Sequence, residues 1–304
     1  MAATEPRNHH YVPQFFLRNF AIDPEKKKIT TVAKNGPLAI WAKRSIERIG
    51  FERDLYVHLR GGVPVSVESA INKRIETPIS KSDTWAKIVS GRTDALDRSD
   101  KPILYALIRH LEARTPHYLA TTMELARLAA APNSDIPFTY EERERYAYLR
   151  ANPDRAKTAF NLMSASLRWT EASFTGAALS IFRSPIPLRS STTPVLSIPA
   201  PAHRALRLPL PGMVPYQFVL TLNRTTIASL VLADFDDAFV NTEISAEVAR
   251  GFNRYFVGQF ARFEHVRHLI TDRHDLAVDM TWAPYDLVAD TERKVSFRRR
   301  TCRP

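Results

Sequence analysis

The chain has 304 residues, of which 44% are hydrophobic, so it can bury a sizeable core as one large or two modest domains. Its formal net charge is +11, and its single cysteine, Cys302, excludes an intrachain disulfide and a cysteine-based zinc site. No stretch approaches the ~18 apolar residues of a membrane helix, and the start of the chain lacks a signal-peptide pattern, so we expect a cytoplasmic protein without a transmembrane segment.

The N-terminal region, residues 1–67, is predicted to combine a histidine motif with short hairpins. The adjacent histidines His9 and His10 precede an aromatic-rich apolar segment that ends at Phe20. Because chain termini fray unless they are held, we expect a segment this apolar to be docked, with both imidazoles fixed in place. Pairs of short apolar runs flank turn signals and predict two hairpins, 28–33 with 38–41 and 55–59 with 63–67.

Residues 68–176 are predicted to form a central helical bundle. Ile71, Ile75 and Ile79 recur at a spacing of four, which is typical of a helix, although Pro78 should kink or end it. Ser99 is the expected N-cap of the next helix. Further apolar patterns predict helical segments in 119–128, 140–149 and 160–174.

Residues 177–292 are predicted to hold a small antiparallel β unit and a long helix, packed with the bundle as one unit. The apolar runs 217–222 and 226–232 give the strongest hairpin signal in the chain. A stripe of apolar residues, mostly phenylalanines, predicts a long amphipathic C-terminal helix over 241–270. The predicted fold class is therefore α+β, closed by a disordered basic tail at 293–304.

The N-terminal motif also carries a family resemblance. His10-Tyr11-Val12-Pro13, followed by Phe16-Leu17 and Phe20, resembles the opening of a widespread, mainly bacterial family of proteins of unknown function. Where that family has Ser-Asp-Asn-Pro, this chain has Ser191-Thr192-Thr193-Pro194 and so lacks the acidic residue. The resemblance implies a shared fold and no particular activity. Further matching positions are Glu68, Glu76, Arg114-Thr115-Pro116 and Asn241.

The N-terminal motif supplies the main candidates for chemistry. His9 and His10 could join Glu68 and Glu76 as ligands of a divalent metal ion, since imidazoles with carboxylates suit Mn²⁺, Fe²⁺ or Zn²⁺. Arg114 could hold a phosphate or carboxylate, which makes His9, His10 and Arg114 the catalytic candidates. In the alternative interpretation His10 anchors the docked N-terminus, Arg114 forms an ion pair, and both glutamates lie on a helix surface.

Other sequence patterns give weaker site hypotheses. The nine glycines form no phosphate-binding loop, and no Gly-x-Ser-x-Gly elbow occurs. The His-x-x-Pro spacing is similar to the opening of His-Asn-His nucleases, although no histidine lies between His10 and His58. Glu25-Lys26-Lys27 resembles the Glu-x-Lys of restriction-type nucleases, but also a solvated turn. Glu264, His265, His268 and Asp272 could line one face of the late helix as metal ligands or simply as its polar face.

The last twelve residues carry more than half of the excess positive charge. Without their six cations, 37 basic groups face 32 acidic groups, an excess of +5. Such a segment is attracted to polyanions, either nucleic acid or anionic lipid, or serves as a solubilising extension. Its candidate polyanion-binding residues are Arg293, Lys294, Arg298, Arg299, Arg300 and Arg303.

Two functional hypotheses therefore remain open. The first is a non-catalytic interaction protein that uses its basic tail and in which the histidine motif is structural. The alternative is a metal-dependent hydrolase or nuclease that acts on a phosphorylated or nucleic-acid substrate through the motif. The sequence leaves the oligomeric state open.

Overall fold

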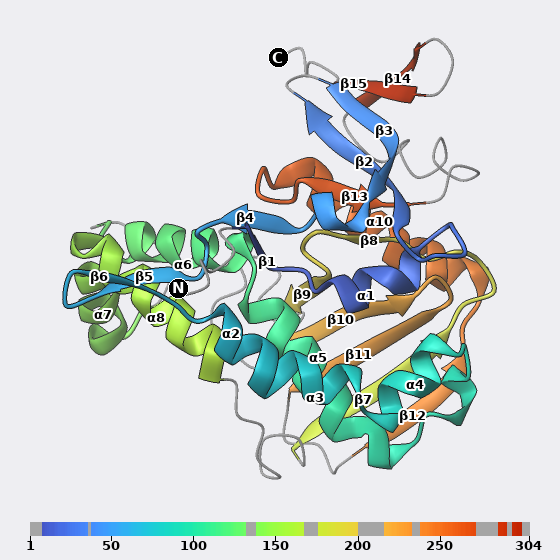
Figure 1. The fold of residues 1–304 in the computed structure, drawn as a ribbon, viewed down its shortest axis with the longest axis horizontal. Helices are drawn as coiled ribbons and strands as arrows, with labels where there is room; N and C mark the ends of the chain where they lie inside the picture. Colours follow the sequence, from blue (N-terminus) through green and yellow to red (C-terminus); the bar gives the residue numbers. More distant parts are fainter. Residues whose placement is uncertain are drawn as a thin grey trace, which may run out of the picture.

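Most of the described strands belong to two large sheets (Figure 1). The structure is a computed structural model that describes residues 8–35, 38–131, 138–166, 176–199, 216–232, 238–271, 285–290 and 294–299. Within these residues a six-stranded sheet has the order β14-β15-β3-β2-β13-β8, and a five-stranded sheet has the order β12-β7-β11-β10-β9. Only β12 and β7 pair in parallel among the described strands of these two sheets.

The strands of the two sheets come from distant parts of the chain. The six-stranded sheet contains β2 (Lys28–Asn35), β3 (Leu38–Ser45), β8 (Ser190–Ser191), β13 (His268–Ile270), β14 (Tyr285–Asp290) and β15 (Lys294–Arg299). The five-stranded sheet contains β7 (Ala177–Arg183), β9 (Val195–Pro199), β10 (Tyr216–Asn223), β11 (Thr226–Leu232) and β12 (Phe239–Glu243).

The N-terminal motif is docked, as its apolar character predicts. The histidines lie on β1 (Asn8–His10), which pairs with β4 (Phe51–Arg53), and the backbone N–H groups of Tyr11 and Val12 both donate to the carbonyl oxygen of Gly50. The short helices α1 (Gln14–Leu17) and η1 (Arg18–Phe20) follow. The side chains that hold the motif in the core are Tyr11, Val12, Phe16, Leu17 and Phe20, each at most 2% exposed.

Helices cover the sheets and extend to one side of the molecule. In Figure 1, α6, α7 and α8 gather beside the hairpin of β5 (Val57–Arg60) and β6 (Val63–Ser66). The helices are α2 (Glu68–Ile71), α3 (Thr77–Ser80), α4 (Asp83–Val89), α5 (Lys101–Ala113), α6 (Pro116–Ala129), α7 (Tyr140–Ala151), α8 (Pro153–Ser166) and α10 (Ala246–Arg262). Short helical turns are η2 (Ile46–Arg48), the π-helix η3 (Asn72–Glu76), η4 (Thr93–Ala95) and η5 (Arg98–Asp100).

The five-stranded sheet is buried on both faces. Successive residues of β10 belong to different clusters: Phe218 and Leu220 pack in the cluster that includes Leu107 and Leu111 of α5, whereas Val219 packs in the cluster that includes Phe256 of α10. Side chains alternate between the faces of a strand, so a continuous apolar run is what two-sided burial requires. The second cluster also contains Val32 and Trp41 of the six-stranded sheet, which places α10 against both sheets.

The prediction of an α+β fold with a central helical bundle, a small antiparallel β unit and a long C-terminal helix is wrong. The β structure is a major part of the molecule, with sheets of six and five strands in the described residues. The helix expected over 241–270 is only α10, which Ser245 caps and which ends at Arg262. The segments on either side of α10 form the strands β12 and β13. The prediction missed them because a short apolar run fits a helical stripe and a strand equally well.

The basic tail also differs from its prediction. Residues 294–299 form β15, which pairs with β14 and with β3, whereas the sequence predicted disorder for 293–304. In this pairing Phe297 of β15 lies opposite Ala39 of β3, so two apolar residues face each other across the strands. The prediction of disorder rested on the charge of the segment and did not include this pairing. Arg293, Arg300 and Arg303 lie outside the described residues.

Candidate functional site

His9 lies in a buried network on the docked N-terminal strand. Its side chain is 1% exposed and stacks on Tyr56, with ring centroids 5.7 Å apart and planes inclined by 8°. The backbone N–H of Tyr56 donates to Nδ1 of His9 at 2.9 Å. Because a neutral imidazole carries one proton, this bond assigns the proton to Nε2, which lies 3.6 Å from Oε2 of Glu68.

Glu68 joins His9 to the backbone of His10. Its carboxylate accepts a hydrogen bond from the His10 backbone N–H. Burial raises the pKa of Glu68 above its ordinary range, although the neighbouring His9 and the His10 N–H act in the opposite direction. The imidazole of His10 has other neighbours: its Nε2 lies 3.3 Å from the Glu47 carbonyl oxygen and 3.5 Å from the side-chain nitrogen of Gln14.

Arg114 is the centre of the same network. The side chain is 1% exposed, and Nη1 donates to Glu76 while Nη2 donates to the backbone oxygen of His10. Its Nε donates to the Tyr56 hydroxyl at 3.0 Å, and that hydroxyl donates back to the Arg114 carbonyl oxygen at 2.8 Å. Nη1 also lies 2.8 Å from Nε2 of His110, which must accept because a guanidinium has only donors.

The network keeps one carboxylate charged and one histidine neutral. Burial alone would raise the pKa of Glu76, but Arg114 and His110 lower it to about 2. Burial and the charge of Arg114 lower the pKa of His110 to about 4. Arg114 and Glu76 therefore form a buried ion pair at neutral pH, and His110 supplies an uncharged acceptor beside it.

A π-helix brings the two glutamates to this network. Over eight residues an α-helix rotates about 80° beyond two full turns, which would separate Glu68 from Glu76 around the axis. The wider turn of η3, Asn72–Glu76, reduces this offset because its hydrogen bonds run from residue i to i+5. Pro78 lies in the first turn of α3, directly after η3, and the helical backbone continues past it to Ser80, so Pro78 does not end the helix.

The structure brings some predicted site residues together but does not direct their atoms to a common ligand position. His9 faces Glu68, and Arg114 faces Glu76, while the ring of His10 points to Glu47 and Gln14. The backbone of His10, rather than its imidazole, connects the two pairs. Across the described residues, no group of three or more His, Cys, Asp and Glu has the arrangement needed to hold a metal ion.

The weaker hypotheses have different outcomes. Glu25 pairs with Lys27 at 2.9 Å in an exposed turn, which agrees with the solvated alternative. Glu264 and His265 are exposed after the end of α10, and His268 lies on β13, so they do not share one helix face. Asp272 lies outside the described residues.

Two members of the network, Tyr56 and His110, are not among the residues that the sequence points to. Tyr56 lies within an apolar run, which gives no sign that its hydroxyl and backbone N–H bind Arg114 and His9. His110 has a usable signal, because it lies four residues before Arg114 on the buried face of α5. Thr192 also contacts the motif, because its side chain forms a hydrogen bond with Tyr11. The resembling family has an acidic residue at this position.

A comparison with protein families gives one match. A family model described as "Protein of unknown function (DUF4238)" matches residues 8–165, just over half of the chain. The match begins at the histidine strand and includes every residue of the buried network. No curated protein and no solved structure matches the chain. None of the helices in the described ranges combines the length and the apolar character needed to span a bilayer.

Proposed function

The chain belongs to the DUF4238 family of proteins of unknown function, and we propose that it is a non-catalytic, cytoplasmic interaction protein whose basic C-terminal segment binds polyanions. In this proposal the N-terminal histidine motif is structural. The motif holds β1 and the helical turns that follow it against the core, and it does not bind the partner itself.

The observation that carries the proposal is the internal use of the motif's polar atoms. Nδ1 of His9 accepts from the Tyr56 backbone, so a metal ion at Nε2 would have to displace the ring proton that faces Glu68. All three guanidinium nitrogens of Arg114 donate to protein atoms, which leaves no pair of donors for a substrate phosphate. The geometry therefore supports a structural role over a metal-dependent hydrolase or nuclease.

Charges on the six-stranded sheet support polyanion binding. The basic segment enters this sheet as β15, beside β3, which carries the exposed Lys43. Arg44 and Arg267 also lie near His268 of β13, where their charges add to the effect of burial in lowering the pKa of that histidine to about 4. Phosphate groups that replace their counterions with such cations give binding that weakens steeply with salt.

The proposal is tested by DNA binding at several salt concentrations. Because residues 294–299 form a strand, we would keep the backbone and replace Arg298, Arg299 and Arg300 by Gln. Fluorescence anisotropy with a labelled duplex should show weaker binding by the triple variant. Its log–log salt slope should be shallower by up to about 0.9 for each phosphate that the variant no longer neutralises.

A matched control separates this segment from overall charge. The variant Arg143→Gln, Arg145→Gln, Arg150→Gln removes three cations from α7, far from β15 in Figure 1. Its binding and salt slope should stay close to those of the wild type. Equal weakening by both triple variants would assign the effect to net charge, and a wild type that binds no duplex at low salt would reject polyanion binding by this segment.

A further inference from the structure

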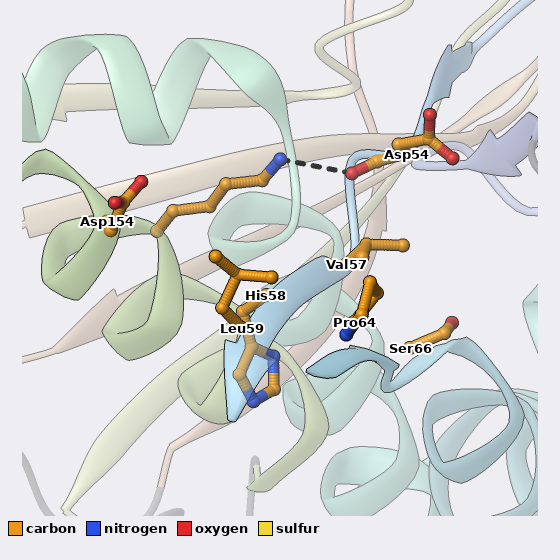
Figure 2. Close-up of a pocket in the computed structure, with 8 residues that line it drawn as sticks. Asp54, Val57, His58, Leu59, Pro64, Ser66 and Asp154 are labelled. Carbon is orange, nitrogen blue, oxygen red and sulfur yellow. Dashed lines mark hydrogen bonds between the residues drawn. The ribbon is translucent and has the colours of Figure 1, made fainter. Parts of the chain in front are cut away.

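A surface cavity of about 500 Å³ lies between the β5–β6 hairpin and α8 (Figure 2). Its volume is within the range of small-molecule sites, which are commonly about 300–1,000 Å³. The cavity is separate from the polyanion segment and does not depend on it. The lining residues are Asp54, Val57, His58, Leu59, Pro64, Ser66, Asp154 and Lys157.

One wall of the cavity is an apolar hairpin face. The register pairs Leu59 with Pro64 and Val57 with Ser66, so these four side chains share one face of the hairpin. Leu59 is 58% exposed, although large aliphatic side chains are usually covered. Gly61 and Gly62, both with positive φ, form the turn of this hairpin, and its strand β5 packs beside α8.

The opposite wall carries two charges that do not pair with each other. Asp154 and Lys157 are three residues apart on α8, a spacing that allows an ion pair. Nζ of Lys157 instead donates to the backbone oxygen of Asp54 at 3.1 Å, the dashed line in Figure 2. The carboxylate of Asp154 has no hydrogen-bond or ion-pair partner among the residues that the structure describes, and it lies at the other end of the cavity from Asp54.

His58 also lines the cavity, but its side chain lies on the opposite face of the hairpin from those of Val57 and Leu59. The side chain is 9% exposed, and its Nδ1 has no hydrogen-bond partner in the described part of the chain. The remaining carboxylate, that of Asp54, is already 3.6 Å from Nε of Arg53.

We propose that this cavity binds a small zwitterion with an aliphatic body, such as a free aliphatic amino acid. The unpaired carboxylate of Asp154 would accept the ligand ammonium group. Lys157, which still has N–H groups to donate, would bind the ligand carboxylate, and Val57, Leu59 and Pro64 would contact the aliphatic side chain. The cavity therefore offers one carboxylate, that of Asp154, and one ammonium group, that of Lys157. A zwitterion pairs with both groups, whereas a simple cation or anion pairs with only one.

The test uses leucine and two analogues that each lack one charge. The backbone amide signals of β5, β6 and α8 in the ¹⁵N-labelled full chain are followed during titration to millimolar concentrations. Leucine should cause saturable shifts. Isocaproate, which lacks the ammonium group, and isoamylamine, which lacks the carboxylate, should bind about tenfold more weakly, as expected for the loss of a hydrogen bond between charged groups.

Surface variants then assign each charge to its residue. Asp154→Asn should weaken leucine and isoamylamine but not isocaproate, and Lys157→Gln should weaken leucine and isocaproate but not isoamylamine. The control pair Asp94→Asn and Lys81→Gln changes exposed residues outside the cavity and should leave all three titrations unchanged. Equal binding of leucine and both analogues, or no saturable shifts with leucine, would overturn the proposal.

Discussion

The two ends of the chain use charged residues in opposite ways. At the N-terminal end, Arg114 and His9 are buried, Glu76 is 15% exposed, and each has several partners within the protein. At the C-terminal end, residues 293–304 carry six cations and no acid, and residues 294–299 of this segment form β15 in the six-stranded sheet. Residue type alone therefore does not mark a site. A histidine or arginine whose donors and acceptors are satisfied internally stabilises the fold, whereas the cations of the C-terminal segment are the ones that we propose bind a polyanion.

The largest expected effect comes from removing Arg114. The variant Arg114→Ala leaves Glu76 buried without its ion-pair partner, and breaking such a pair by removing one member costs about 3–5 kcal/mol in the free energy of unfolding. Urea denaturation of the wild type and the variant measures this loss.

An exposed arginine–glutamate pair on α6 serves as a control for the buried pair. Arg127 pairs with Glu124 at 2.7 Å, but the two side chains are 61% and 43% exposed. Arg127→Ala should therefore leave the free energy of unfolding close to that of the wild type, because exposed ion pairs contribute little to stability. Similar losses in both variants would contradict the assignment of Arg114 to a buried structural network.

The second effect is a pH dependence from His110. Burial and Arg114 lower its pKa from 6.5 to about 4, so between these values the unfolded state binds a proton that the folded state does not. Stability should therefore fall as the pH falls from 6.5 to 4, by ~3 kcal/mol from this group. His110→Gln keeps an acceptor for Arg114 and should lose this part of the pH dependence. Urea denaturation at pH 7 and pH 4 compares the two proteins, and an unchanged pH dependence would mean that His110 is not held neutral.

A smaller effect tests how the N-terminal motif is docked. Gly50 has a φ of +64°, and a Cβ atom there would lie 2.8 Å from Cβ of Val12. Gly50→Ala therefore combines backbone strain with a clash and should cost about 2–3 kcal/mol. Gly61 has a φ of +59° but open space around it, so Gly61→Ala should cost only about 1 kcal/mol. Thermal unfolding of both variants measures the difference, and equal melting temperatures would show that the motif can move away from Gly50.

The sequence predicts local pairing better than long-range pairing. The hairpins β2–β3, β5–β6 and β10–β11 were expected because alternating or apolar runs flank clear turn residues. The pairings of β13 with β2 and of β15 with β3 join strands more than 200 residues apart. Apolar periodicity indicates which face of a strand is buried, but it does not identify the partner strand.

The same limit applies to the candidate site. The family resemblance identified Glu68, Glu76 and Arg114 as matching positions, and the apolar periodicity predicted a helix that contains both glutamates. Neither could show that Arg114 bonds Glu76 and the His10 backbone, because these contacts span 38 and 104 residues of sequence. The π-helix that aligns the glutamates has no signal of its own in the sequence.

The position of the ring proton on His9 tests whether the histidine motif is structural. Long-range ¹H–¹⁵N correlation spectra of the full chain distinguish the two ring nitrogens and their protons. The predicted result is a neutral imidazole with its proton on Nε2, unchanged by excess Zn²⁺, because Nδ1 accepts the Tyr56 N–H. A proton on Nδ1, or a His9 ring signal that shifts on addition of Zn²⁺ and is restored by a chelator, would contradict the claim and support a metal site.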